Sequence, residues 1–90
     1  MVRKLRWTRR ALRRLEEIAT FIAQDNPARA TTFVSELRDK VTHLAEHQLG
    51  KPGRVSGTRE LVLHRHYVVV YRVKEDEVHI LTLLHTAQQR

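Results

Sequence analysis

Two stretches of helical periodicity occupy the first half of the chain. Apolar residues recur every three or four positions from Ala11 to Ala23, and a second stripe runs from Ala30 to Ala45. Thr8 is placed to cap the first helix, and the break between the stripes contains Asn26, which can cap, and Pro27, which suits a first helical position. Because this break is short, the pattern predicts two antiparallel neighbouring helices, an αα-hairpin.

The last third of the chain has the pattern of a β-meander. Strands are expected at Thr58–His64, Tyr67–Val73 and Val78–Leu84, joined by short polar turns. The middle strand is apolar on both faces of its pleat, which is typical of an interior strand that is covered on both sides or lines a groove. Val2–Trp7 alternates apolar and basic residues with one slip, and predicts an edge strand guarded by its charges. This strand can reach the sheet only by crossing over the helices, to lie beside the central or the last strand of the meander.

These elements give the order β-α-α-β-β-β and an α+β fold. The N-terminal strand and the helical hairpin are expected to pack on a small antiparallel sheet, in one domain that spans residues 1–90. The longest loop, residues 48–57, holds all 3 glycines and one of the 2 prolines. It also carries Lys51 and Arg54, and a basic Gly/Pro loop can approach phosphates closely, although it lacks the spacing of a P-loop.

Positive charge is concentrated at the start of the chain. The formal net charge is +7, the isoelectric point is about 10.8, and no acidic residue precedes Glu16. Attraction to an anionic partner, either nucleic acid or an acidic protein, follows from this asymmetry. The alternative is a solvated helix face on which Arg13 pairs with Glu17 one turn later. The basic residues of the first 14 positions are Arg3, Lys4, Arg6, Arg9, Arg10, Arg13 and Arg14.

Composition excludes several classes of protein. The chain has no cysteine, which rules out disulfides and thiol catalysis and fits a reducing cytoplasm. No apolar run is long enough for a signal sequence or for the roughly 20 residues of a membrane span. A cytoplasmic protein without membrane association is therefore expected.

The titratable residues of the meander do not form a recognisable cofactor or metal motif. His64 and His66 share a pleat face and His79 could lie near them. A zinc site, however, needs a third ligand and further groups that hydrogen-bond and orient the ligands. Asp76-Glu77 is better interpreted as a turn than as a pair of catalytic carboxylates. We therefore expect neither a metal nor a cofactor.

The block from Gly57 to His85 carries a more specific signal. It contains GTREL, then HYVVVYRV, then an acidic turn, then VHILTLLH. Tyr71-Arg72-Val73 in the middle strand, Leu84-His85 at the end of the last strand and the DNPARA turn between the helices belong to the same pattern. With the order of elements, these features resemble the RelE/ParE superfamily of toxins from bacterial type II toxin–antitoxin modules, and specifically its ParE-like (RelE/StbE-like) branch.

The resemblance implies a toxin that a cognate antitoxin holds inactive by wrapping its C-terminal segment over the surface. The target implied is DNA gyrase for ParE-like members, or mRNA on the ribosome for RelE-like endoribonucleases. A small core and surplus positive charge also favour an acidic, partly disordered partner that folds on binding. The helical hairpin and the sheet edge are the expected seat of this antitoxin.

Candidate residues favour gyrase inhibition over RNA cleavage. Cleavage through the 2′-hydroxyl needs a base, a cation at the scissile phosphate and an acid. The positions where the resemblance implies ribonuclease arginines hold Val68 and Gln88, and the late tyrosine has no counterpart. If the chain is nevertheless an endoribonuclease, Arg72 and His85 would carry the catalysis; otherwise they are a surface arginine and a hydrogen-bonded histidine at a strand end. The expected target-binding or nucleic-acid-binding residues are Lys51, Arg54, Arg59, Arg65 and Arg72.

A third hypothesis is a small basic nucleic-acid-binding module. Such a module would present aromatic side chains for base stacking on an open sheet. Tyr67 and Tyr71 are instead expected on a core face, which counts against this hypothesis.

Overall fold

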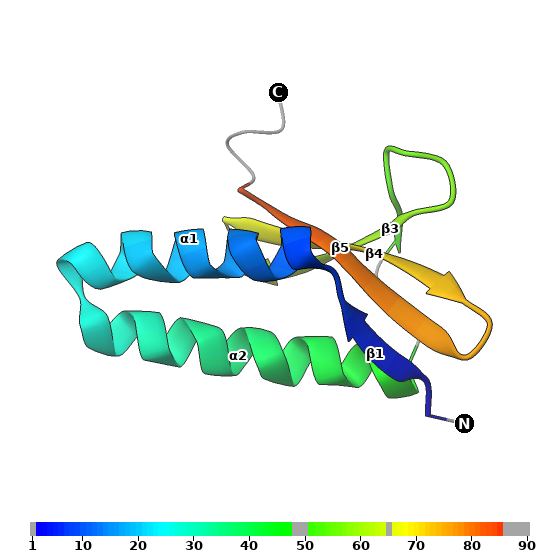
Figure 1. The fold of residues 1–90 in the computed structure, drawn as a ribbon, viewed down its shortest axis with the longest axis horizontal. Helices are drawn as coiled ribbons and strands as arrows, with labels where there is room; N and C mark the ends of the chain where they lie inside the picture. The colour runs from blue at the N-terminus through cyan, green and yellow to red at the C-terminus, as the bar shows by residue number, and fades with distance from the viewer. Residues whose placement is uncertain (1, 48–50, 65, 86–90) are drawn as a thin grey trace.

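Two antiparallel helices pack on one face of a five-stranded sheet (Figure 1). The computed structural model describes residues 2–47, 51–64 and 66–85. The expected α+β architecture is confirmed, with element bounds within a few residues of those predicted. In chain order, the elements are β1 (Lys4–Trp7), α1 (Arg9–Asp25), α2 (Pro27–Glu46), β2 (Lys51–Pro52), β3 (Arg59–His64), β4 (Tyr67–Lys74) and β5 (Glu77–His85).

The strand order in the sheet is β1-β5-β4-β3-β2. The antiparallel meander β3-β4-β5 is as predicted, and β1 lies beside the last strand, one of the two expected places. The pairing of β1 with β5 is parallel, with Lys4 opposite Glu77, so the sheet is mixed. Within the expected loop, Lys51 and Pro52 form the short strand β2, which pairs with Glu60 and Arg59. A strand of two residues has no periodicity by which the sequence could predict it.

The helical hairpin is closed by one residue that serves both helices. The side chain of Asn26 accepts a hydrogen bond from Arg29 N at 3.0 Å, and its own backbone N–H donates to Ile22 O at 2.9 Å. Pro27 follows at the first position of α2, where its missing N–H costs nothing. The predicted N-caps, Thr8 for α1 and Asn26 for α2, are therefore confirmed. Asn26 alone connects the two helices. Within the described ranges, neither helix is both long and apolar enough to cross a membrane.

The hydrophobic core lies between the helices and one face of the sheet. Its fully buried side chains include Leu37, Tyr71 and Ile80, and the ring of Tyr67 meets Phe33 edge to face with centroids 5.0 Å apart. Because successive side chains of a strand alternate, the other face of β4 points away from the helices. We call that second face the open face.

Candidate functional site

The open face is divided into an apolar end and a charged end by the strand register. Val62, Val68 and Leu84 lie side by side in one row across β3, β4 and β5. Val68, in the middle of this row, is 5% exposed, whereas Val62 at its side is 53% exposed. Glu60, Val70 and Thr82 form the next row. The row of Val62, Val68 and Leu84 is therefore the part of this face that offers an apolar surface to a partner.

The charged end is organised around Glu77. One oxygen of its carboxylate accepts a hydrogen bond from Arg6 Nε at 2.9 Å, and the other is hydrogen-bonded to His79 Nε2 at 2.8 Å. These contacts, first the hydrogen bond from His79 and then Arg6, lower the pKa of Glu77 below its ordinary value. An ionised carboxylate can only accept, so His79 Nε2 carries the donated proton and its other ring nitrogen is available to a ligand.

Arg72 completes this charged row. It lies directly opposite His79 on the neighbouring strand, in the same row as Arg6. Its side chain is exposed, and among the described residues it has no hydrogen-bond or ion-pair partner. An exposed guanidinium without a partner can receive a carboxylate or a phosphate in bidentate geometry. With respect to the described residues, the row therefore places an arginine without a partner beside a histidine held by a carboxylate.

The structure does not bring Arg72 and His85 together. His85 pairs with Tyr67, whose ring belongs to the helix-facing core, whereas Arg72 lies on the open face at the other end of β4. His85 stacks on His66 with ring centroids 5.7 Å apart and meets Tyr67 edge to face at 5.0 Å. The expected catalytic pair thus occupies two faces of the sheet.

The other expected cations are distributed over two places. Lys51 is exposed on β2 opposite Glu60, and the backbone N–H of Arg54 donates to the same Glu60 carboxylate at 3.2 Å. Arg59 pairs with Tyr71, so its side chain lies on the helix-facing side, where its Nε is buried. Arg65 lies outside the described residues. Lys51 and Arg54 therefore form an exposed basic corner at the edge of the sheet, to which Arg59 does not belong.

That basic corner is shaped by Gly53. Its backbone N–H donates to Thr58 O at 2.8 Å, which folds the loop back onto the start of β3. A Cβ at Gly53 would collide with the Thr58 hydroxyl, so only glycine allows this close approach.

Sequence reasoning missed the contact between Glu77 and His79. Glu77 was expected in the turn, but the turn is Glu75-Asp76, and Glu77 is the first residue of β5. The signal was present, because residues two apart in a strand share a pleat face. Among the described residues, no group of three histidine, cysteine or acidic side chains is close enough to hold a metal ion.

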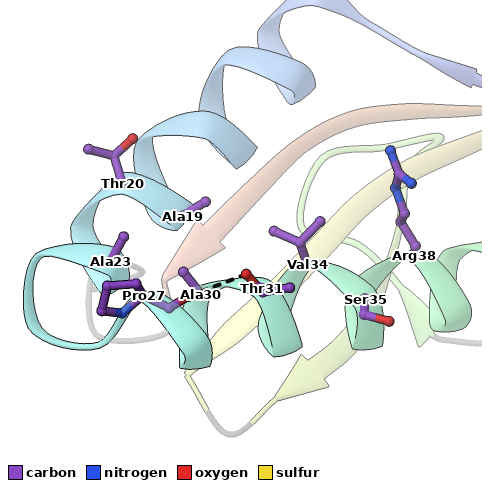
Figure 2. A pocket seen from close by; sticks show the side chains of 9 residues that line it. All are labelled: Ala19, Thr20, Ala23, Pro27, Ala30, Thr31, Val34, Ser35 and Arg38. Carbon is purple, nitrogen blue, oxygen red and sulfur yellow. Dashed lines mark hydrogen bonds between the residues drawn. The ribbon is translucent and has the colours of Figure 1, made fainter.

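A second surface feature is a groove between the two helices (Figure 2). Most of the side chains that line it are small, and Arg38 stands at one end of it (Figure 2). Val34 also packs against the core, which ties the floor of the groove to the rest of the fold. The residues that line it are Ala19, Thr20, Ala23, Pro27, Ala30, Thr31, Val34, Ser35 and Arg38.

Comparison with known proteins identifies the family. The family model described as the ParE toxin of the type II toxin–antitoxin system parDE matches residues 5–90. The chain belongs to the ParE family of type II toxins. It is 46% identical over 89 residues to protein Y4kP of Sinorhizobium fredii, covering 97% of this chain and 92% of that protein. Toxin RelE2 of Caulobacter vibrioides is 36% identical over 84 residues, which cover 91% of this chain and 93% of that toxin.

A solved ParDE structure has the same fold. The chromosomal ParDE toxin–antitoxin system from P. aeruginosa includes a chain that superposes with a TM-score of 0.83 at 29% identity, covering 93% of this chain and 96% of that chain. The helical hairpin, the mixed sheet and its open face are therefore features of a ParE-family toxin. The earlier resemblance to the RelE/ParE superfamily is confirmed.

Proposed function

We propose that this ParE-family toxin inhibits DNA gyrase and that a cognate antitoxin neutralises it. The observation that carries the choice of target is the environment of Val68. This residue stands on the open face of the central strand where a ribonuclease relative would place an arginine, and it is 5% exposed. The likeness to the ParDE system of P. aeruginosa supports the same branch of the superfamily.

The surroundings of Val68 oppose phosphate chemistry. Val62 and Leu84 flank it in the same row, so the centre of the open face is apolar across three strands. A phosphate bound there would lose its hydrating water, and no cation would be present to compensate its charge. Such a surface is better suited to binding protein than to positioning a scissile phosphate.

Antitoxin binding is assigned to the groove between α1 and α2. Small side chains such as Ala19, Ala23 and Ala30 leave a concave apolar surface into which larger apolar side chains of a partner segment can fit. Arg38 at its end suits an acidic residue of that segment. The net charge of +7 adds long-range attraction to an acidic antitoxin.

An assay with purified components tests the proposed target. Gyrase supercoiling of relaxed plasmid is measured with increasing toxin, with and without the antitoxin, and translated mRNA is probed in parallel after induction in cells. We expect supercoiling to be lost, antitoxin to restore it, and mRNA to stay intact. Early, site-specific cuts in translated mRNA together with normal supercoiling would reject gyrase as the target.

One observation favours RNA cleavage as a second candidate function. His79 is oriented by Glu77 at 2.8 Å and lies opposite Arg72, which has no partner among the described residues, so a base held by a carboxylate stands beside a cation. That is the arrangement needed to take a 2′-hydroxyl proton near a phosphate. If mRNA is cut, His79→Gln should abolish the cuts while the fold is retained, which would assign the catalysis to His79 rather than His85.

A further inference from the structure

Three arginines form a cationic patch at the start of α1. We call Arg9, Arg10 and Arg13 the arginine turn. All three side chains are exposed, and at 3.6 residues per turn they lie within an arc of about 100° on the helix surface. Residues three or four apart on a helix have Cβ atoms about 5–6 Å apart, so the three guanidinium groups share one small surface.

The charge of the arginine turn is not neutralised by the fold. Among the residues that the structure describes, none of its three side chains has a hydrogen-bond or ion-pair partner. The expected pair between Arg13 and Glu17 is not formed, because Glu17 instead binds Arg14 at 3.3 Å. Arg14 also donates to Leu83 O at 3.2 Å and so serves to attach α1 to β5. Arg14 has a structural role, whereas the arginine turn makes no such contact within the described part of the chain.

This arrangement opposes the stability of the helix. The first turn of α1 contains no acidic residue, although the N-terminus is the positive end of a helix and favours negative charge. Arg9 and Arg13 also repel each other across one turn. The backbone amides at this helix end are not the proposed anion-binding groups, because the Thr8 hydroxyl already accepts a hydrogen bond from Ala11 N at 3.1 Å. No contact with the residues that the structure describes compensates the repulsion among these three cations, and an external anion would offset it.

We propose that the arginine turn binds the phosphate backbone of duplex DNA. Guanidinium groups bind phosphates in bidentate geometry, and their spacing over one helical turn suits successive phosphates of a strand. Base stacking plays no part, because Trp7, the aromatic residue next to the patch in sequence, packs against the core. An acidic protein is the alternative partner, but a protein interface is built around an apolar centre, and the arginine turn consists of charged side chains. The contact goes beyond gyrase inhibition, since it is made to DNA itself.

Salt dependence of DNA binding tests the proposal. Purified toxin is titrated onto a short labelled duplex at several salt concentrations, and the triple variant R9Q/R10Q/R13Q is compared with wild type. Each lost phosphate contact reduces the slope of log K against log salt by about 0.9, so we expect a reduction of about 2–3. Affinity at low salt should fall at least about tenfold. The thermal midpoint of the variant should stay level or rise, since its helix loses unfavourable charge.

A control with equal net charge separates a local site from general attraction. The variant R29Q/R38Q/K74Q removes three cations elsewhere and should keep the wild-type slope. Equal loss of slope in both variants would overturn the proposal. So would an arginine-turn variant that keeps its DNA slope but no longer binds the antitoxin, because the partner would then be an acidic protein. The DNA-binding assay contains no gyrase. Its result therefore stands even if the toxin fails to inhibit gyrase in the supercoiling assay.

Discussion

The hydroxyl of Thr8 donates to the carbonyl oxygen of Ile80 at 2.8 Å, although the two residues lie 72 positions apart. The same hydroxyl accepts from Ala11 N at 3.1 Å and so caps α1. The backbone N–H of Thr8 donates to the same Ile80 carbonyl at 3.1 Å. One side chain therefore joins β1, the start of α1 and the middle of β5.

Thr8→Val keeps the shape of the side chain and removes all its hydrogen bonds. The loss of a helix cap costs about 1–2 kcal/mol, and the Ile80 carbonyl also loses a donor. We expect the free energy of unfolding, measured in urea, to fall by at least that amount. Thr42→Val is the control, since the Thr42 hydroxyl only donates to Arg38 O on the exposed side of α2. Equal stability of the two variants would contradict the junction role of Thr8.

Glu77→Gln should make the stability of the toxin less dependent on pH. The pKa of Glu77 is lowered in the folded protein, so its ionised form stabilises the fold above the unfolded carboxyl pKa of about 4.3, and this contribution is lost as the pH falls through the lowered folded value. Wild type should exceed Glu77→Gln in stability at neutral pH, and the difference should vanish in acid. Urea unfolding across this range measures it. Glu16→Gln should show no such difference, because Glu16 is exposed and makes no ion pair with the described residues.

Ala23→Phe should block the antitoxin and leave the toxin active. Ala23 lines the groove between the helices and is only half-buried, so an aromatic ring there fills the groove without disturbing the core. Co-purification with the antitoxin should be lost, and co-expressed antitoxin should no longer rescue growth. Gln24→Phe places the same ring on the neighbouring position outside this groove and should remain neutralised. Normal rescue of Ala23→Phe would exclude the groove as the antitoxin seat.

Arg72→Ala should weaken the toxin without weakening its fold. The side chain is exposed and unpaired among the described residues, so its removal costs little stability. If the charged end of the open face contacts the target, the toxin concentration for half-inhibition of supercoiling should rise at least about tenfold, equivalent to one interface anchor. Arg38→Ala, which removes an exposed arginine from α2, is the matched control for an assay without antitoxin. Unchanged inhibition by Arg72→Ala would show that the charged end of the open face does not contact the target.

The fold was predictable because the main signals are local. Helical spacing, the caps Thr8 and Asn26, and the alternation of the meander each specify an element from neighbouring residues alone. The direction of β1 was not predictable, since periodicity does not encode whether a strand runs parallel to its partner. The short strand β2 was missed because Lys51-Pro52 is too short to show any pattern.

The candidate site was less predictable because it depends on register. Arg72 and His85 both end apolar runs in the sequence, but the pairing of β4 with β5 places His79 opposite Arg72 and His85 opposite Tyr67. A register shift between Val70 and Tyr71 contributes to this, and such shifts leave no mark in the composition. The hydrogen-bonded ion pair between Arg6 and Glu77 likewise joins residues that lie 71 positions apart in the chain.

The parallel pairing of β1 with β5 has a consequence for how the toxin is made. A nascent chain presents β1 and α1 well before their partner strand β5 has left the ribosome. Contacts between residues this distant form late, after the entropy of closing the long intervening loop has been paid. Until then neither the outer pair of strands nor the junction at Thr8 exists. A chain whose translation stops before β5 should therefore lack the β1–β5 strand pair and the hydrogen bonds from Thr8 to Ile80 that fix the start of α1.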